Sequence, residues 1–95
     1  VPLDYAESKK WYRQSAEQGN LFAQFWLGII YEFGNGVLKN LINAHMWYNI
    51  AAAAGDTRAI KTRSAIEKIM TKKDISQALN SAEKCMKSYY KECNW

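Results

Sequence analysis

The first candidate for chemistry is His45, the one histidine in the sequence. An imidazole can act as a general base or bind a metal ion, but either role needs partner side chains at a suitable distance. Asn43 and Asn49, its polar neighbours in sequence, are weak partners for both roles. No cluster of His, Cys, Asp or Glu has the spacing of a metal site. We therefore expect a surface or packing histidine, no metal ion and no cofactor.

Two patterns that support catalysis in other proteins are incomplete here. The segment Gly34-Asn35-Gly36 lacks the lysine and the serine or threonine of a phosphate-binding loop, and no strand precedes it. The serine residues have no histidine and aspartate that the sequence can assign to a catalytic triad. The sequence therefore predicts no catalytic residues and no enzymatic activity.

The two cysteines, Cys85 and Cys93, lie eight residues apart near the end of the sequence. In one continuous helix this separation corresponds to about 12 Å along the axis, which is too far for a disulfide. A disulfide therefore requires the helix to end between them, for example after Tyr89 and Tyr90, with the tail folding back. Two unpaired thiols are the alternative.

Composition and charge limit the remaining classes of function. The sequence is 48% apolar, so we expect a folded domain. No apolar run approaches the roughly 18 residues of a membrane span. Residues 56–95 hold nine basic and five acidic groups, and the signs alternate as on a solvated helical surface. Nucleic-acid binding is an alternative function, but the aromatic and basic residues do not interleave as stacking platforms would. We therefore expect no nucleic-acid partner.

A repeat organises most of the chain. Shifting the sequence by 36 positions brings identical residues into register: Trp11 and Trp47, Tyr12 and Tyr48, Ala16 and Ala52, Gly19 and Gly55, Ala23 and Ala59, and Ile30 and Ile66. A period of this length is typical of paired helices that bury their faces by stacking on neighbouring repeats. We expect both tryptophans of the repeat to be buried and its alanines to let helices approach closely.

Capping residues divide the chain into five expected helices. Asp4, Asn20, Asp56 and Thr71 are suitable N-caps, and the first three helix ends are marked by glycines. The expected helices span about 6–18, 21–33, 41–54, 57–70 and 73–89. Gly28 lies inside the second of them, where glycine costs about 1 kcal/mol relative to alanine. We therefore expect another helix to pack against its backbone.

These residues resemble the Sel1-like repeat family, a relative of the tetratricopeptide repeats, and the closing helix resembles its bacterial members. The resemblance covers about residues 1–66 and rests on Ser8, Trp11, Tyr12, Ala16, Gly19, Asn20, Ala23, Gln24, Leu27, Gly28, Tyr31, Gly34, Gly36, Val37 and Asn40, and on Ala44, Trp47, Tyr48, Ala51, Ala52, Gly55 and Ala59 in the second copy. Arg63 and Glu67 replace Leu27 and Tyr31 in that copy, as expected for the capping end of an array.

The resemblance implies an all-α fold, an antiparallel helix-pair α/α solenoid of about five helices in a single domain, 1–95. Residues 1–19 would form the second helix of a truncated repeat, 20–55 a full repeat, and 56–95 a last helix pair with a capping helix. Val1-Pro2-Leu3-Asp4-Tyr5 matches the join between the two helices of a repeat. We therefore expect the chain to have been cut from a longer protein or an exported precursor.

The resemblance also implies a function, a scaffold or adaptor that binds another protein or peptide. The alternatives are a binder of peptides or cell-wall fragments, or a hydrolase of the family's cysteine-rich, β-lactamase-like branch. That branch has a cysteine pair in each repeat, and residues 1–84 contain no cysteine. Members with a similar two-cysteine tail are often exported. The resemblance thus favours a Cys85–Cys93 disulfide and a periplasmic or secreted bacterial protein, with a cytoplasmic location as the alternative.

The candidate partner-binding residues lie on the helix expected at 21–33, which is apolar on almost every side. The repeat pattern uses one face, and a second stripe remains at helical spacing: Phe22, Trp26, Ile29, Ile30 and Phe33. The family usually has a polar residue at the position of Trp26 and often at that of Phe33. We therefore select Phe22, Trp26, Ile29 and Phe33 as partner-binding candidates. Coverage by the closing helix or by an upstream repeat, and self-association, are the alternatives.

Overall fold

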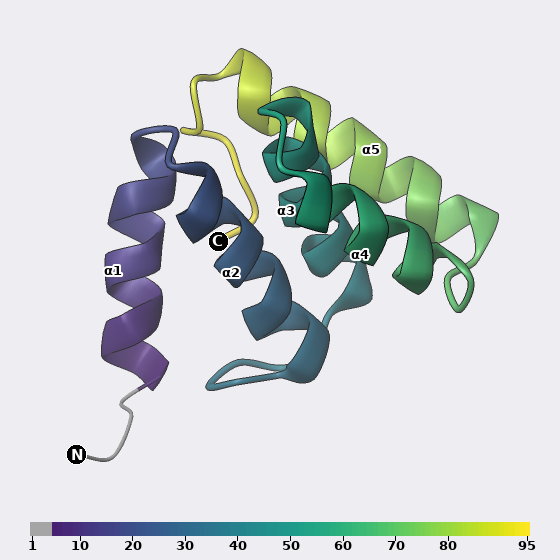
Figure 1. Ribbon diagram of the computed structural model, residues 1–95, viewed down its shortest axis with the longest axis horizontal. Helices are drawn as coiled ribbons and strands as arrows, with labels where there is room; N and C mark the ends of the chain where they lie inside the picture. The colour runs from purple at the N-terminus through teal and green to yellow at the C-terminus, as the bar shows by residue number, and fades with distance from the viewer. Residues whose placement is uncertain (1–4) are drawn as a thin grey trace.

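The computed structural model describes the backbone of residues 5–95 and the side chains from Lys10 onward (Figure 1). Five α-helices make up this part of the chain: α1 (Tyr5–Glu17), α2 (Leu21–Phe33), α3 (Leu41–Ala53), α4 (Thr57–Glu67) and α5 (Lys72–Lys87). This is the expected all-α fold of antiparallel helices. The expected cap Asp4 and the expected repeat join at its start lie outside the described residues.

Side-chain caps start α2, α4 and α5 at the predicted residues Asn20, Asp56 and Thr71, and Asn40 caps α3, where no cap was predicted. Asn20 Oδ1 accepts hydrogen bonds from the backbone N–H groups of Phe22 and Ala23, at 2.9 and 3.1 Å. Such caps satisfy donors that the first helical turn leaves without partners. At the other end of α2, Gly34 adopts a left-handed φ of 71°, and its N–H bonds to the carbonyl of Ile30. The apolar helix therefore stops at Gly34 because the backbone turns there in a conformation that favours glycine.

The last two helices end earlier than predicted. α4 ends at Glu67 instead of near residue 70, and α5 ends at Lys87 instead of near residue 89. After α5, Tyr89 and Tyr90 adopt left-handed φ values of 54° and 66°. The N–H of Tyr90 donates to the carbonyl of Cys85 at 2.8 Å. This bond closes the helix end and turns the chain back toward its N-terminal half.

Helix α3 forms the centre of the stack. It packs against α2, α4 and α5, whereas α1 packs against α2 (Figure 1). The core is built around the largest fully buried side chains: Trp47, Tyr48, Leu27, Met46 and Ile50. The closing helix α5 thus covers α3. From the sequence, coverage of the second stripe of α2 by this helix was an alternative.

The close approach predicted at Gly28 is confirmed. The ring of Tyr48 on α3 lies so close to this glycine that an added Cβ would be 2.4 Å from its Cε1 atom. The Tyr48 hydroxyl donates a hydrogen bond to Glu32 at 2.6 Å, also on α2. The burial of Tyr48 and its contact with Glu32 raise the pKa of Tyr48 far above its ordinary value.

The expectation that both repeat tryptophans are buried is wrong for Trp11. Trp47 is fully buried, but Trp11 is 61% exposed. The two residues occupy the same position in the repeat, yet α3 has helices packed on several sides. Among the described helices, α1 packs extensively against α2 alone. The burial of a repeat position therefore depends on its neighbours in the stack.

Candidate functional site

His45 is buried in the interface between α3 and α4 and forms one of two polar pairs there. Its Nε2 atom lies 2.7 Å from Glu67 Oε2. Close by, Arg63 donates to Asn49 Oδ1 at 2.6 Å. Arg63 and Glu67, which depart from the repeat pattern, thus each pair with a residue of α3. His45 is a packing residue, as expected, but its partner is Glu67 and not one of its neighbours in sequence.

Replacing Glu67 with alanine is expected to lower the free energy of unfolding by about 1–2 kcal/mol, because it leaves the Nε2 atom of His45 buried without a partner. Glu67→Gln keeps an acceptor and should lose less. Urea unfolding measures the difference. The control is Glu83→Ala, which removes an exposed ion pair with Lys87 and should leave stability nearly unchanged. An equal decrease in the free energy of unfolding for both alanine variants would show that the buried pair stabilises the chain no more than the exposed one.

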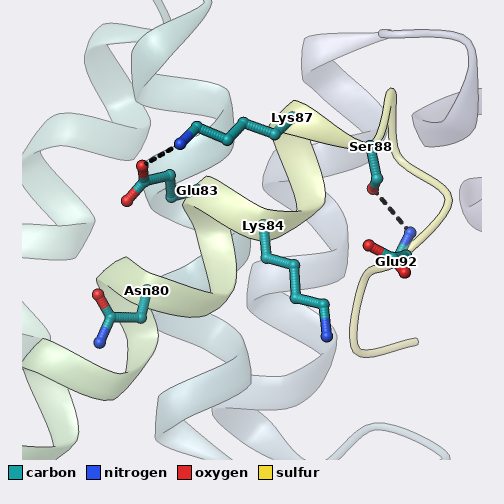
Figure 2. A pocket seen from close by; sticks show the side chains of 6 residues that line it. All are labelled: Asn80, Glu83, Lys84, Lys87, Ser88 and Glu92. Carbon is teal, nitrogen blue, oxygen red and sulfur yellow. Dashed lines mark hydrogen bonds and ion pairs between the residues drawn. The ribbon is translucent and has the colours of Figure 1, made fainter.

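A surface hollow of about 480 Å³ lies along α5 and is shown in Figure 2. It is lined by Asn80, Glu83, Lys84, Lys87, Ser88 and Glu92. Glu83 and Lys87 pair at 2.7 Å, and the Ser88 hydroxyl accepts a hydrogen bond from the Glu92 N–H at 2.8 Å. These two contacts join four of the six lining residues, and no imidazole or thiol lines the hollow. Within the described residues, no group of three or more His, Cys, Asp and Glu is placed to hold a metal ion.

The outer side of α2 carries the candidate partner-binding residues. Phe22, Trp26 and Phe33 are 59%, 43% and 66% exposed, and Ile29 is half-buried. Ile30, which the sequence placed on the same stripe, is buried in the core. This difference arises because residues 29 and 30 differ by 100° around the helix, so one reaches the edge of the stripe and the other points inward.

The apolar surface continues from α2 onto α1. The ring of Tyr12 stacks on Trp26, with centroids 6.4 Å apart and planes 17° from parallel. The rings of Trp11 and Tyr12 meet edge to face, with centroids 5.1 Å apart. We call the surface formed by Trp11, Tyr12, Phe22, Trp26 and Phe33 the aromatic face. The sequence did not place the two α1 residues on it, because both belong to the repeat pattern and Trp11 was expected to be buried.

Arg58, from the first turn of α4, lies beside this surface. Its guanidinium is 5.0 Å from the centroid of the Phe22 ring and 4.5 Å from that of Phe25. Asp56 orients it through an ion pair of 2.8 Å. The hydrogen bond from Arg58 lowers the pKa of the Asp56 carboxyl and outweighs the opposing effect of burial. Sequence reasoning missed Arg58 because no local pattern places the start of α4 against α2.

Cys85 and Cys93 form a disulfide, with their Cα atoms 4.5 Å apart. Helix α5 ends between them, which is the geometry that such a pair requires. The bond ties the C-terminal segment to the buried side of α5, where Cys85 has no exposed surface. Among the described residues, no helix has the length and apolar character needed to cross a membrane.

The chain is similar to a known repeat family and to a characterised yeast protein. The model of the family described as Sel1 repeat matches residues 1–20 and 21–56, more than half of the chain. The chitin synthase regulator SKT5 of Saccharomyces cerevisiae is 44% identical over 62 residues. The matched region is 64% of this chain and 9% of the yeast protein, so the chain spans a small part of that relative. No solved structure matches the chain.

Proposed function

The chain belongs to the Sel1 repeat family, and on that premise we propose that it is a scaffold module that binds another protein through its aromatic face. Sel1 repeats generally mediate protein–protein interaction, which supports the class of function. The observation that carries the proposal is the exposure of large aromatic side chains from both α1 and α2. Exposed apolar surface of this kind typically marks an interaction site.

The residue types of the aromatic face suit the centre of an interface. Tryptophan, tyrosine and arginine dominate the residues whose truncation weakens protein complexes most. Tyr12 and Trp26 hold each other by stacking, so little side-chain freedom is lost when a partner binds. Arg58 adds a cation that Asp56 already orients. We propose that Trp26 and Phe33 are the main anchors and that Arg58 contributes at the edge.

We also propose that the chain is non-catalytic and works in an oxidising compartment. The family and the regulator relative favour a non-catalytic scaffold, and turnover of a chromogenic β-lactam tests the hydrolase alternative.

The disulfide supports an oxidising location, periplasmic or secreted. Titration of free thiols in the native protein tests this location. Membership of the bacterial branch stays a prediction, since the relative comes from yeast.

The test uses three forms of the chain as bait in extract from its own host. Trp26→Asn with Phe33→Asn removes the two proposed anchors. Ile69→Asn is the matched control, because Ile69 is exposed, apolar and occupies the repeat position of Phe33. We expect the double variant to retain at least about tenfold less partner than the native bait, while the control retains it in full. Circular dichroism must show that all three baits are folded.

Each other outcome has a defined meaning. If Ile69→Asn loses the captured protein equally, capture depends on general apolar surface and the aromatic face is not the site. If the double variant does not fold, these residues are part of the core and the assignment is wrong. If the captured protein is a second copy of this chain, the aromatic face mediates self-association, which sedimentation of the purified chain then measures directly.

A further inference from the structure

The C-terminal segment, residues 91–95, lies between the α1–α2 pair and α3 (yellow in Figure 1). The ring of Trp95 packs on Trp47 of α3 with centroids 4.8 Å apart. The guanidinium of Arg13, on α1, lies 4.9 Å from the centroid of the Trp95 ring. Tyr31, on α2, donates a hydrogen bond from its hydroxyl to the main-chain O atom of Trp95. Three helices therefore contribute one residue each to a site that we call the indole cradle.

The indole cradle occupies a place where helices do not meet. Helix α5 packs directly against α3, but the described part of α1 makes no comparable contact with α3. A non-helical segment, held by side chains of α1, α2 and α3, lies at this position. The contacts to it are those that recognise a peptide: an aromatic surface for a ring, a cation beside that ring, and a hydroxyl donor for a main-chain oxygen.

The segment is held in the cradle by a covalent tether. Cys93 is bonded to Cys85 and lies two residues before Trp95, so the indole stays close to its site at high effective concentration. The turn that returns the chain to the cradle uses left-handed backbone at Tyr89 and Tyr90, a conformation that non-glycine residues disfavour. Local preference therefore works against this path, and the disulfide and the cradle contacts maintain it.

We propose that the indole cradle of Arg13, Tyr31 and Trp47 is a binding site for an extended peptide segment that presents a tryptophan, and that residues 91–95 occupy it in cis while the disulfide is intact. The site is separate from the aromatic face and does not rest on the function proposed above. Cys93 is partly exposed, so a dithiol can reach the bond. Reduction transfers two electrons and two protons from the dithiol, which becomes a disulfide, and leaves Cys85 and Cys93 as thiols.

Reduction weakens the internal occupant without removing it. Once reduced, the tail remains attached through the turn that follows α5, and it still competes with any peptide at a lower effective concentration. Full opening therefore requires the loss of both the tether and the indole. The variant that achieves this combines Cys85→Ala, Cys93→Ser and Trp95→Ala, and we call it the open variant.

The test measures binding of a fluorescein-labelled peptide with the sequence of residues 89–95, carrying serine in place of cysteine. Fluorescence anisotropy should show that the open variant binds it at least about tenfold more tightly than the oxidised native chain. A second peptide with alanine in place of tryptophan should bind at least about tenfold more weakly. Arg13→Gln in the open variant should weaken binding several-fold, and Trp26→Asn with Phe33→Asn should leave it unchanged.

Three results would overturn the proposal. The first is a folded open variant that does not bind the peptide. The second is equal binding of the tryptophan and alanine peptides. The third is an open variant that does not fold, because the tail would then be part of the core. Hydrogen exchange of the native chain before and after treatment with a dithiol checks this last point: faster exchange confined to the tail and the cradle supports a releasable occupant, whereas faster exchange through all helices contradicts it.

Discussion

Replacing Gly28 with alanine is expected to lower the free energy of unfolding by about 2–3 kcal/mol, although alanine is the better helix former by about 1 kcal/mol. The new Cβ would lie 2.4 and 2.5 Å from Cε1 and Cδ1 of Tyr48. The ring has little room to move, because it is fully buried and its hydroxyl is bonded to Glu32. The helices α2 and α3 would have to separate, and leucine at this position should cost more than alanine.

Thermal unfolding followed by circular dichroism measures this effect. A loss of 2–3 kcal/mol in a chain of this size corresponds to a decrease in Tm of about 10–20 °C. The matched control is Ser64→Ala, since Ser64 occupies the repeat position of Gly28 but is exposed on α4. Its stability should change by less than about 0.5 kcal/mol. An unchanged Tm for Gly28→Leu would refute the close approach of Tyr48.

Replacing Asp56 with alanine is expected to lower the free energy of unfolding by about 2 kcal/mol, at the upper end of the effect of losing an N-cap. The nearly buried carboxylate accepts hydrogen bonds from the backbone N–H groups of Arg58 and Ala59, at 2.9 and 3.3 Å. It also holds the guanidinium of Arg58 against Phe22 and Phe25. On the function proposed above, the variant should therefore also weaken partner binding through the aromatic face.

The contribution of Asp56 should depend on pH in a defined direction. Because the hydrogen bond from Arg58 lowers its pKa in the folded chain, the unfolded chain binds the proton more readily. The stabilisation is therefore fully present above the unfolded pKa of about 3.9 and is lost as pH falls through the lower folded pKa.

Urea unfolding at pH 7 and at about pH 2.5 tests this dependence in the native chain and in Asp56→Asn. The asparagine keeps a cap but does not titrate, so its stability should decrease less between the two pH values than that of the native chain. An equal decrease in both would show that Asp56 does not contribute to the acid sensitivity. Asp74→Asn is the control, since Asp74 lies in the first turn of α5 without being its cap.

The sequence by itself determined the approximate bounds of the helices and the close approach of α3 to Gly28. The bounds of α2 agree with those expected from Asn20 and Gly34, because capping and backbone conformation depend on residues within one turn of each other. The packing at Gly28 could also be inferred, because a glycine inside a helix of strong formers has no local justification. The repeat also predicted the helix pairs, because its spacing shows which face of each helix is apolar.

The tertiary structure alone decided which of these faces are covered. Trp11 and Trp47 have the same place in the repeat, but one is exposed and the other lies under the indole of Trp95. Glu67 reaches His45, and Arg58 reaches Phe22, across distances in sequence that no local pattern spans. Such contacts depend on how whole helices stack and where the tail returns, and the same apolar stripe can be core or surface depending on the neighbour that the fold places beside it.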